Sequence, residues 1–159
     1  MHRALLLLAM SACVALPANA VDTATLSSLL QRAGVEHEVD GDRLHVVYRL
    51  ESGRRQAVFL APMAPLVDGV DVVEIYSPVQ RLTADLPAAV AGQLLEANGT
   101  QKVAYFGVEE VEGAWWLLCY HNLPLDAITP KALAAVMQAV AAAADDMERL
   151  LGDGGADEL

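Results

Sequence analysis

Histidines are scarce in this 159-residue chain, which contains four of them. After residue 20 the histidines are His37, His45 and His121. An imidazole titrates near neutral pH and binds zinc, so these three residues are the candidates for a small hydrolase or a metal-dependent enzyme. Either activity requires that three or more polar side chains converge in a pocket.

The motifs around these histidines do not match a catalytic or metal site. His37-Glu38 lacks the second histidine of a zinc-binding helix, and Cys119-x-His121 offers too few ligands for zinc. Asp40-Gly41-Asp42 lacks the ligand order of a calcium loop. The sequence has no Gly-x-Ser-x-Gly turn and no phosphate-binding glycine loop. We therefore expect no catalytic residue, no metal and no cofactor.

Three other polar features have structural explanations. The segment Glu109-Glu110-Val111-Glu112-Gly113 predicts a solvated hairpin turn, with calcium or a basic partner as the minor alternative. Cys119 is the last cysteine of the chain and has apolar neighbours, which predicts a buried, unreactive thiol and no internal disulfide. Asn98-Gly99-Thr100 is a glycosylation sequence, but Gly99 is also explained as the end of a helix.

The first 20 residues predict an export signal. Arg3 precedes the apolar run 4–16, and the helix breaker Pro17 follows it. The expected cleavage site is formed by Ala18, Ala20 and Val21. We therefore expect a periplasmic or secreted protein with a signal peptide at 1–20, a single α+β domain at 21–152 and a flexible acidic tail at 153–159.

Two alternatives to cleavage remain open. An uncleaved anchor would need about 20 apolar residues, and this run is shorter. Met10-Ser11-Ala12-Cys13 loosely resembles a lipobox, in which case Cys13 would carry the lipid anchor.

The composition limits the partners. Cleavage would leave 139 residues, the size of one domain, and would remove one basic residue and no acidic one, so that the formal charge changes from −11 to −12. A surface with this charge repels nucleic acids and anionic lipids. We expect no nucleic-acid partner and no membrane insertion after cleavage.

The spacing of apolar residues and turn signals predicts an α+β fold, with three helices and an antiparallel sheet of about five strands in the order α-β-β-β-α-β-β-α. The expected elements are a helix from Asp22 or Thr23 to Gly34, strands near 44–50, 56–61 and 70–76, a loop at 62–69, a helix from Asp85–Pro87 to Asn98-Gly99, a hairpin of 102–108 and 114–121, and a helix from Thr129 to Gly152.

Two apolar features could contact a partner. Met137 and Met147 lie in the long stripe of the last helix, which either dimerises, grips a peptide or packs on its own sheet; the many small alanines favour packing. Trp115 and Trp116 point to opposite sides of one strand, so both sides of that strand need cover. The second side is covered by the chain itself, by a second copy or by another molecule.

The chain from about Leu26 to Leu151 resembles the YbjN family of small bacterial proteins. The residues that carry this resemblance are Leu94-Leu95-Glu96-Ala97-Asn98, Trp116-Leu117-Leu118, and 123–130 before the long last helix. The resemblance implies a fold similar to that of type III secretion chaperones, no catalytic residues, and a non-enzymatic protein that binds proteins or peptides. An export signal does not suit a cytoplasmic secretion chaperone, so a periplasmic binding or accessory protein fits better.

The sequence therefore favours an exported, non-enzymatic protein with a protein or peptide client or a homodimeric partner. The alternatives are a periplasmic enzyme that uses His37, His45 or His121, and a structural component of the envelope.

Overall fold

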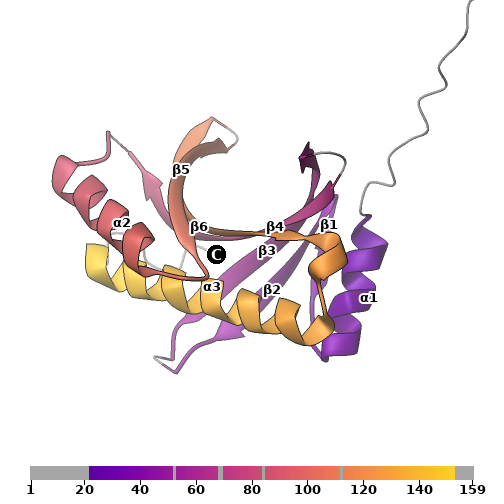
Figure 1. Cartoon of the computed structure of the whole chain (residues 1–159). Helices are drawn as coiled ribbons and strands as arrows, with labels where there is room; N and C mark the ends of the chain where they lie inside the picture. Colours follow the sequence, from indigo (N-terminus) through magenta and orange to yellow (C-terminus); the bar gives the residue numbers. More distant parts are fainter. Residues whose placement is uncertain (1–21, 52, 68–69, 84, 112, 153–159) are drawn as a thin grey trace, which may run out of the picture.

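Figure 1 shows the chain as a computed structural model, which describes residues 22–51, 53–67, 70–83, 85–111 and 113–152. The expected signal peptide at 1–20, its cleavage residues Ala18, Ala20 and Val21, and Cys13 lie outside the described residues. Glu112 and the expected acidic tail at 153–159 also lie outside them. The described elements form one sheet with helices on one of its faces.

The first and last helices begin and end where the sequence predicts. Helix α1 (Thr23–Ala33) begins at Asp22, whose carboxylate accepts a hydrogen bond of 2.8 Å from the backbone N–H of Thr25. Gly34 ends it with a φ of 71°, a left-handed conformation that glycine adopts without strain. Helix α3 (Pro130–Leu151) begins at Thr129, whose hydroxyl oxygen accepts from the N–H of Ala132.

Helix α2 (Ala88–Thr100) runs past its expected end at Asn98-Gly99. Gly99 is not among the glycines with a positive φ, so it does not act as a left-handed stop. The helix ends at Gln101, which takes an extended backbone conformation. The amide of Asn98 instead contacts a neighbouring strand: it donates to the backbone oxygen of Phe106 at 3.0 Å and accepts from its N–H at 2.6 Å.

The sheet has six antiparallel strands in the order β1-β2-β3-β4-β6-β5, one more strand than expected. The additional strand is β1, which has three exposed residues and therefore no apolar alternation that a sequence pattern could reveal. The strands are β1 (Glu38–Asp40), β2 (Arg43–Arg49), β3 (Arg55–Val67), β4 (Val70–Leu82), β5 (Tyr105–Val111) and β6 (Ala114–Pro124).

The central hairpin is longer than the sequence predicts. Residues 62–67, expected to belong to a loop, continue β3, and Pro62 pairs with Val73 of β4. The paired part of β2 ends opposite Leu60, so that Pro62 has a strand partner on one side only. Proline is tolerated there because no second neighbour requires its missing N–H.

The helices cover one face of the sheet (Figure 1). Helix α3 packs on β3, β4 and β6, helix α1 lies beside α3 over β2, and α2 contacts β5. The short 3-10 helix η1 (Leu125–Ala127) contacts β4. The apolar side chains of these helices form a single core with those of the sheet, among them Leu26, Leu30, Leu44, Leu60, Ile75, Leu117 and Leu133.

Met137 and Met147 of α3 are buried in this core. Neither side chain is available to a partner on the surface, so the possible contact role of Met137 and Met147 is wrong, and the packing of the stripe on its own sheet, which the alanines favour, is confirmed. The physical reason is that the alanines Ala141 and Ala144 let the helix approach its own sheet closely, and both are buried there. No helix in the described residues is both long and apolar enough to span a bilayer.

Candidate functional site

Within the described residues, one face of the sheet carries no helix. This face, here called the open face, presents a row of aromatic rings. Directly paired residues of antiparallel strands point to the same face of a sheet. The register pairs His45 with Phe59, Phe59 with Tyr76, Tyr76 with Tyr120, and Tyr120 with Tyr105. Five strands thus contribute one ring each to the aromatic row, which consists of His45, Phe59, Tyr76, Tyr120 and Tyr105.

The rings of the aromatic row contact one another along its length. Neighbouring centroids lie 5.2 to 6.5 Å apart, with interplanar angles between 17° and 42°. These values fall in the range of favourable aromatic pairs. The row therefore crosses the sheet perpendicular to the strands as a nearly continuous stack.

Strand alternation places the row opposite the core. The residues next to the rings along the chain, including Leu44, Leu60, Ile75 and Cys119, point to the helices and are buried. Tyr105, at the edge strand, is 40% exposed, whereas Tyr120 is 7% exposed. The remaining three rings are half-buried. The row is thus partly accessible from solvent.

A cation occupies one end of the row. The guanidinium of Arg43 lies 5.3 Å from the centroid of the Phe59 ring and donates to the hydroxyl of Tyr76 at 3.3 Å. The same guanidinium pairs with the carboxylate of Asp40 at 3.1 Å. This end, the Arg43 end, therefore combines a cation, a ring face and a carboxylate.

Carboxylates lie at the other end. The hydroxyl of Tyr120 donates to Glu109 at 2.5 Å. Its ring lies over Gly107, where a Cβ atom would come within 3.2 Å of the ring, a tight contact that would require the ring to shift. Glu74 follows on the same face, opposite Asn122, whose amide donates to the hydroxyl of Tyr105 at 2.8 Å. We call this end, formed by Glu74, Glu109, Tyr105 and Tyr120, the acidic end.

The surroundings raise the pKa of two side chains at the acidic end, Glu74 and Tyr120. Burial, and secondly the charge of Glu109, raise the pKa of Glu74. Burial and the hydrogen bond to Glu109 raise the pKa of Tyr120, so its hydroxyl stays protonated. No ion pair joins Glu74 or Glu109 to a lysine or arginine within the part of the chain that the structure describes. The acidic end therefore holds negative charge without a described cation.

The three histidines lie apart. His37 contacts the hydroxyl of Ser27 through Nε2 at 2.8 Å and the backbone oxygen of Val35 through Nδ1 at 3.1 Å. His45 belongs to the aromatic row, and His121 contacts the backbone oxygen of Val103. In the described ranges, no three His, Cys, Asp or Glu side chains gather where they could hold a metal ion.

Cys119 is buried on the helix side of β6, as the sequence predicts. Burial raises the pKa of its thiol to about 12. A thiol with this pKa stays protonated at neutral pH and is a poor nucleophile.

The two tryptophans occupy different sides of β6. Trp115 is 52% exposed and pairs with Leu82 and Glu110, whereas Trp116 is half-buried on the open face and pairs with Arg81 and Glu109. Trp116 thus borders the acidic end.

The open face is covered in part by the chain's own side chains. Leu118 points to this face and is nevertheless buried, beside the ring of Tyr120 that lies over Gly107. Its strand partner on β5 is Gly107 itself.

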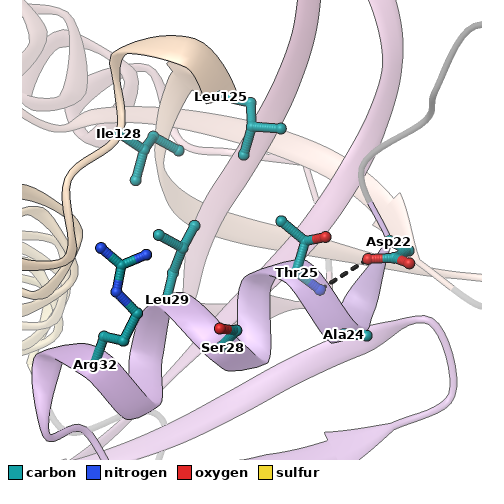
Figure 2. Close-up of a pocket in the computed structure, with 8 residues that line it drawn as sticks. All are labelled: Asp22, Ala24, Thr25, Ser28, Leu29, Arg32, Leu125 and Ile128. Carbon is teal, nitrogen blue, oxygen red and sulfur yellow. Dashed lines mark hydrogen bonds between the residues drawn. The ribbon is translucent and has the colours of Figure 1, made fainter.

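A pocket of about 500 Å³ lies between α1 and the η1 segment (Figure 2). Leu29, Leu125 and Ile128 give it an apolar wall, and Arg32 reaches from α1 toward Ile128. Its polar lining also includes Ser28 and Thr25, whose N–H is bonded to the Asp22 carboxylate (Figure 2). None of the three histidines lines it. The pocket can accept an apolar side chain, and Asp22 is its one carboxylate.

Sequence reasoning missed the aromatic row. Its members are single aromatic residues on five strands, and the register that aligns them depends on turns and on the order of the strands. The available signal was an aromatic residue with an apolar residue on each side, in 44–46 and 58–60.

No family model and no curated protein sequence matches the chain. Among solved structures, the fold is similar to that of E. coli YbjN, with a TM-score of 0.50 and 14% identity over 80% of this chain and 90% of that chain. A second similarity is to the Yersinia pestis type III secretion chaperone SycH, solved in complex with a fragment of YscM2; the TM-score is 0.49 and the identity 18%, over 76% of this chain and 98% of that chain. The YbjN-like α+β fold expected from the sequence is confirmed.

Proposed function

We propose that this chain is an exported, non-enzymatic protein that binds a protein or peptide client through the aromatic row on its open face. The observation that carries the proposal is the row itself, five rings aligned across a sheet face that no helix of the described ranges covers. Tyrosine and other aromatic side chains are enriched at the buried centres of protein interfaces because they bury large areas at little cost in conformational entropy.

The chemistry of the chain supports binding over catalysis. The histidines lie in separate places, and the Cys119 thiol is buried with a raised pKa. The charge of −11 disfavours a nucleic-acid partner, because phosphates would be repelled. A protein or peptide is the class of partner that aromatic rings and carboxylates together suit best.

Export belongs to the same proposal. The basic, apolar and small-residue order of positions 1–20 supports a periplasmic or secreted protein. The free cysteine of the described residues, Cys119, is buried, so the domain can fold in an oxidising compartment without a disulfide.

Site-specific cross-linking in cells tests the proposal. A photoreactive phenylalanine analogue replaces Tyr105 in one strain and Leu95 in another, because Leu95 is also a large exposed side chain, more exposed than Tyr105, but lies on α2. We expect a discrete adduct in the periplasmic fraction from position 105 and none from position 95, identified by mass spectrometry. Equal adducts from both positions, no adduct from 105, or only an adduct with a second copy would contradict a client at the open face.

One observation favours a second function. The Ser27 hydroxyl, the His37 imidazole and the Val35 carbonyl form a chain of contacts of 2.8 and 3.1 Å, the order of groups that activates a serine nucleophile. A hydrolase of this kind would react with a fluorophosphonate probe at Ser27, and the reaction would be lost in Ser27→Ala and in His37→Ala. Absence of labelling in the native protein would exclude this function.

A further inference from the structure

The Arg43 end shows how the aromatic row receives a guanidinium group. Arg43 stacks over Phe59, donates to the Tyr76 hydroxyl and pairs with the Asp40 carboxylate. Three kinds of interaction thus meet on one cation: a ring face, a neutral oxygen acceptor and a carboxylate. Arginine suits this combination because its guanidinium is planar, stacks on rings and donates in several directions at once.

The acidic end offers the same three kinds of group. The rings of Tyr105 and Tyr120 are stacked with centroids 5.5 Å apart, and Tyr105 is the most exposed ring of the row. Glu109 accepts from the Tyr120 hydroxyl, and Glu74 lies on the same face next to Asn122. At the Arg43 end, the carboxylate of Asp40 pairs with the guanidinium of Arg43. Within the described residues, neither Glu74 nor Glu109 forms an ion pair of this kind.

We propose that the acidic end, formed by Glu74, Glu109, Tyr105 and Tyr120, binds the guanidinium group of an arginine in a protein partner. The inference rests on the proposed function and names the group that the open face recognises. The partner's arginine would lie on the exposed face of Tyr105 and pair with Glu109 and Glu74, as Arg43 lies on Phe59 and pairs with Asp40.

Charge complementarity selects this occupant over others. A carboxylate or phosphate would meet the two glutamates and be repelled. An uncharged apolar side chain would contact the rings but would leave two carboxylates desolvated without a cation, which costs free energy. A cation pairs with both, and the repulsion by which Glu109 raises the pKa of Glu74 would then be relieved.

Titration with a defined peptide tests the inference. The probe is a capped peptide of alternating glycine and arginine, added to the intact purified chain at low ionic strength and followed by calorimetry and by the NMR signals of the tyrosine rings. We expect binding that shifts the ring signals of Tyr105 and Tyr120. We also expect Glu74→Gln and Glu109→Gln each to weaken the affinity about tenfold, the size of one lost charge-assisted hydrogen bond.

The chain provides a matched control. Glu110 neighbours Glu109 on β5, is exposed, and points to the helix side of the sheet, where it pairs with Trp115. Glu110→Gln changes the net charge equally, so we expect its affinity to stay within about twofold of the native protein. A glutamine at position 109 still offers an oxygen to the Tyr120 hydroxyl, and circular dichroism would verify that each variant is folded.

Several results would overturn the inference. They are an absence of binding, an equal loss in Glu110→Gln, unshifted tyrosine signals, or equal affinity for the matching lysine peptide. If the adduct at position 105 forms in cells while the arginine peptide does not bind, the inference fails and the proposed function stands. If neither is observed, both fail.

Discussion

At the residue scale, Gly107 is the position at which a single methyl group would alter the acidic end. A Cβ atom there would come within 3.2 Å of the Tyr120 ring. We expect Gly107→Ala to turn this ring away from Glu109 and to destabilise the fold by about 1 to 3 kcal/mol, the usual cost of overpacking. Chemical denaturation measures the loss, and the NMR signals of Tyr120 report the movement.

Gly99→Ala is the control for this substitution. Gly99 lies in α2 with helical backbone and open space around its added methyl group. We expect alanine there to stabilise the protein by about 0.5 to 1 kcal/mol, because alanine favours the helix. A loss of stability in Gly99→Ala together with no effect in Gly107→Ala would contradict both assignments.

Glu74 is the residue whose protonation couples stability to pH. Its pKa in the folded state is raised above the ordinary value of 4.5, first by burial and then by Glu109. The protonated form therefore favours folding: this contribution is complete below the ordinary pKa and is lost as the pH rises through the folded-state pKa.

Glu74→Gln fixes the neutral form, so we expect the variant to have a higher melting temperature than the native protein at pH 7. The difference should shrink as the pH falls through the raised folded-state pKa toward 4.5, and it should be absent below 4.5, where native Glu74 is itself protonated. Thermal unfolding followed by circular dichroism over a pH series measures it. A lower melting temperature for Glu74→Gln at neutral pH would refute the assignment. If the variant is instead more stable but binds the arginine peptide more weakly, then the carboxylate of Glu74 serves binding at a cost in stability.

At the element scale, the amide of Asn98 fastens α2 to the edge strand β5. It forms two hydrogen bonds with the backbone of Phe106, one in each direction. In Asn98→Ala the N–H and C=O of Phe106 lose their partners, and we expect a loss of about 2 kcal/mol in the free energy of unfolding. Thr100→Ala, which removes exposed hydrogen bonds within α2 alone, should cost less than about 0.5 kcal/mol. Urea unfolding that ranks Thr100→Ala as the more damaging change would contradict this role.

The elements also show what the sequence can predict. The caps at Asp22 and Thr129 and the left-handed Gly34 are local signals, and the structure confirms them. Asn98-Gly99 is the same kind of local signal, but the predicted helix end there is wrong, because the Asn98 side chain forms its hydrogen bonds with Phe106 of β5. The rings of the aromatic row meet only through the register of five strands, so no local pattern could place them on one line.

At the scale of the whole molecule, an ion pair with a buried carboxylate ties the sheet to the last helix. Arg54, next to β3, pairs with Asp145 of α3 at 2.6 Å and also with Glu148. The Asp145 side chain is 5% exposed, so removal of Arg54 would weaken the compensation of a buried charge. We expect Arg54→Leu to cost about 3 kcal/mol in the free energy of unfolding.

Arg81→Leu is the comparison, since Arg81 is exposed at the end of β4 and changes the net charge equally. Denaturant unfolding should place Arg81→Leu within about 0.5 kcal/mol of the native protein. Similar losses in the two variants would show that net charge, and not the pair with Asp145, is responsible.

The two outer strands of the sheet, β1 and β5, limit how strands of other molecules can pair with it. One border is the three-residue β1, and on the other the Asn98 amide occupies the outward N–H and C=O of Phe106. Free N–H and C=O groups along the outer strands can pair with strands of other chains and so start fibrils. The short β1 and the Asn98 side chain both reduce the number of such groups. Concentrated solutions of this chain should accordingly resist amyloid formation, and Asn98→Ala should bind thioflavin sooner than the native protein.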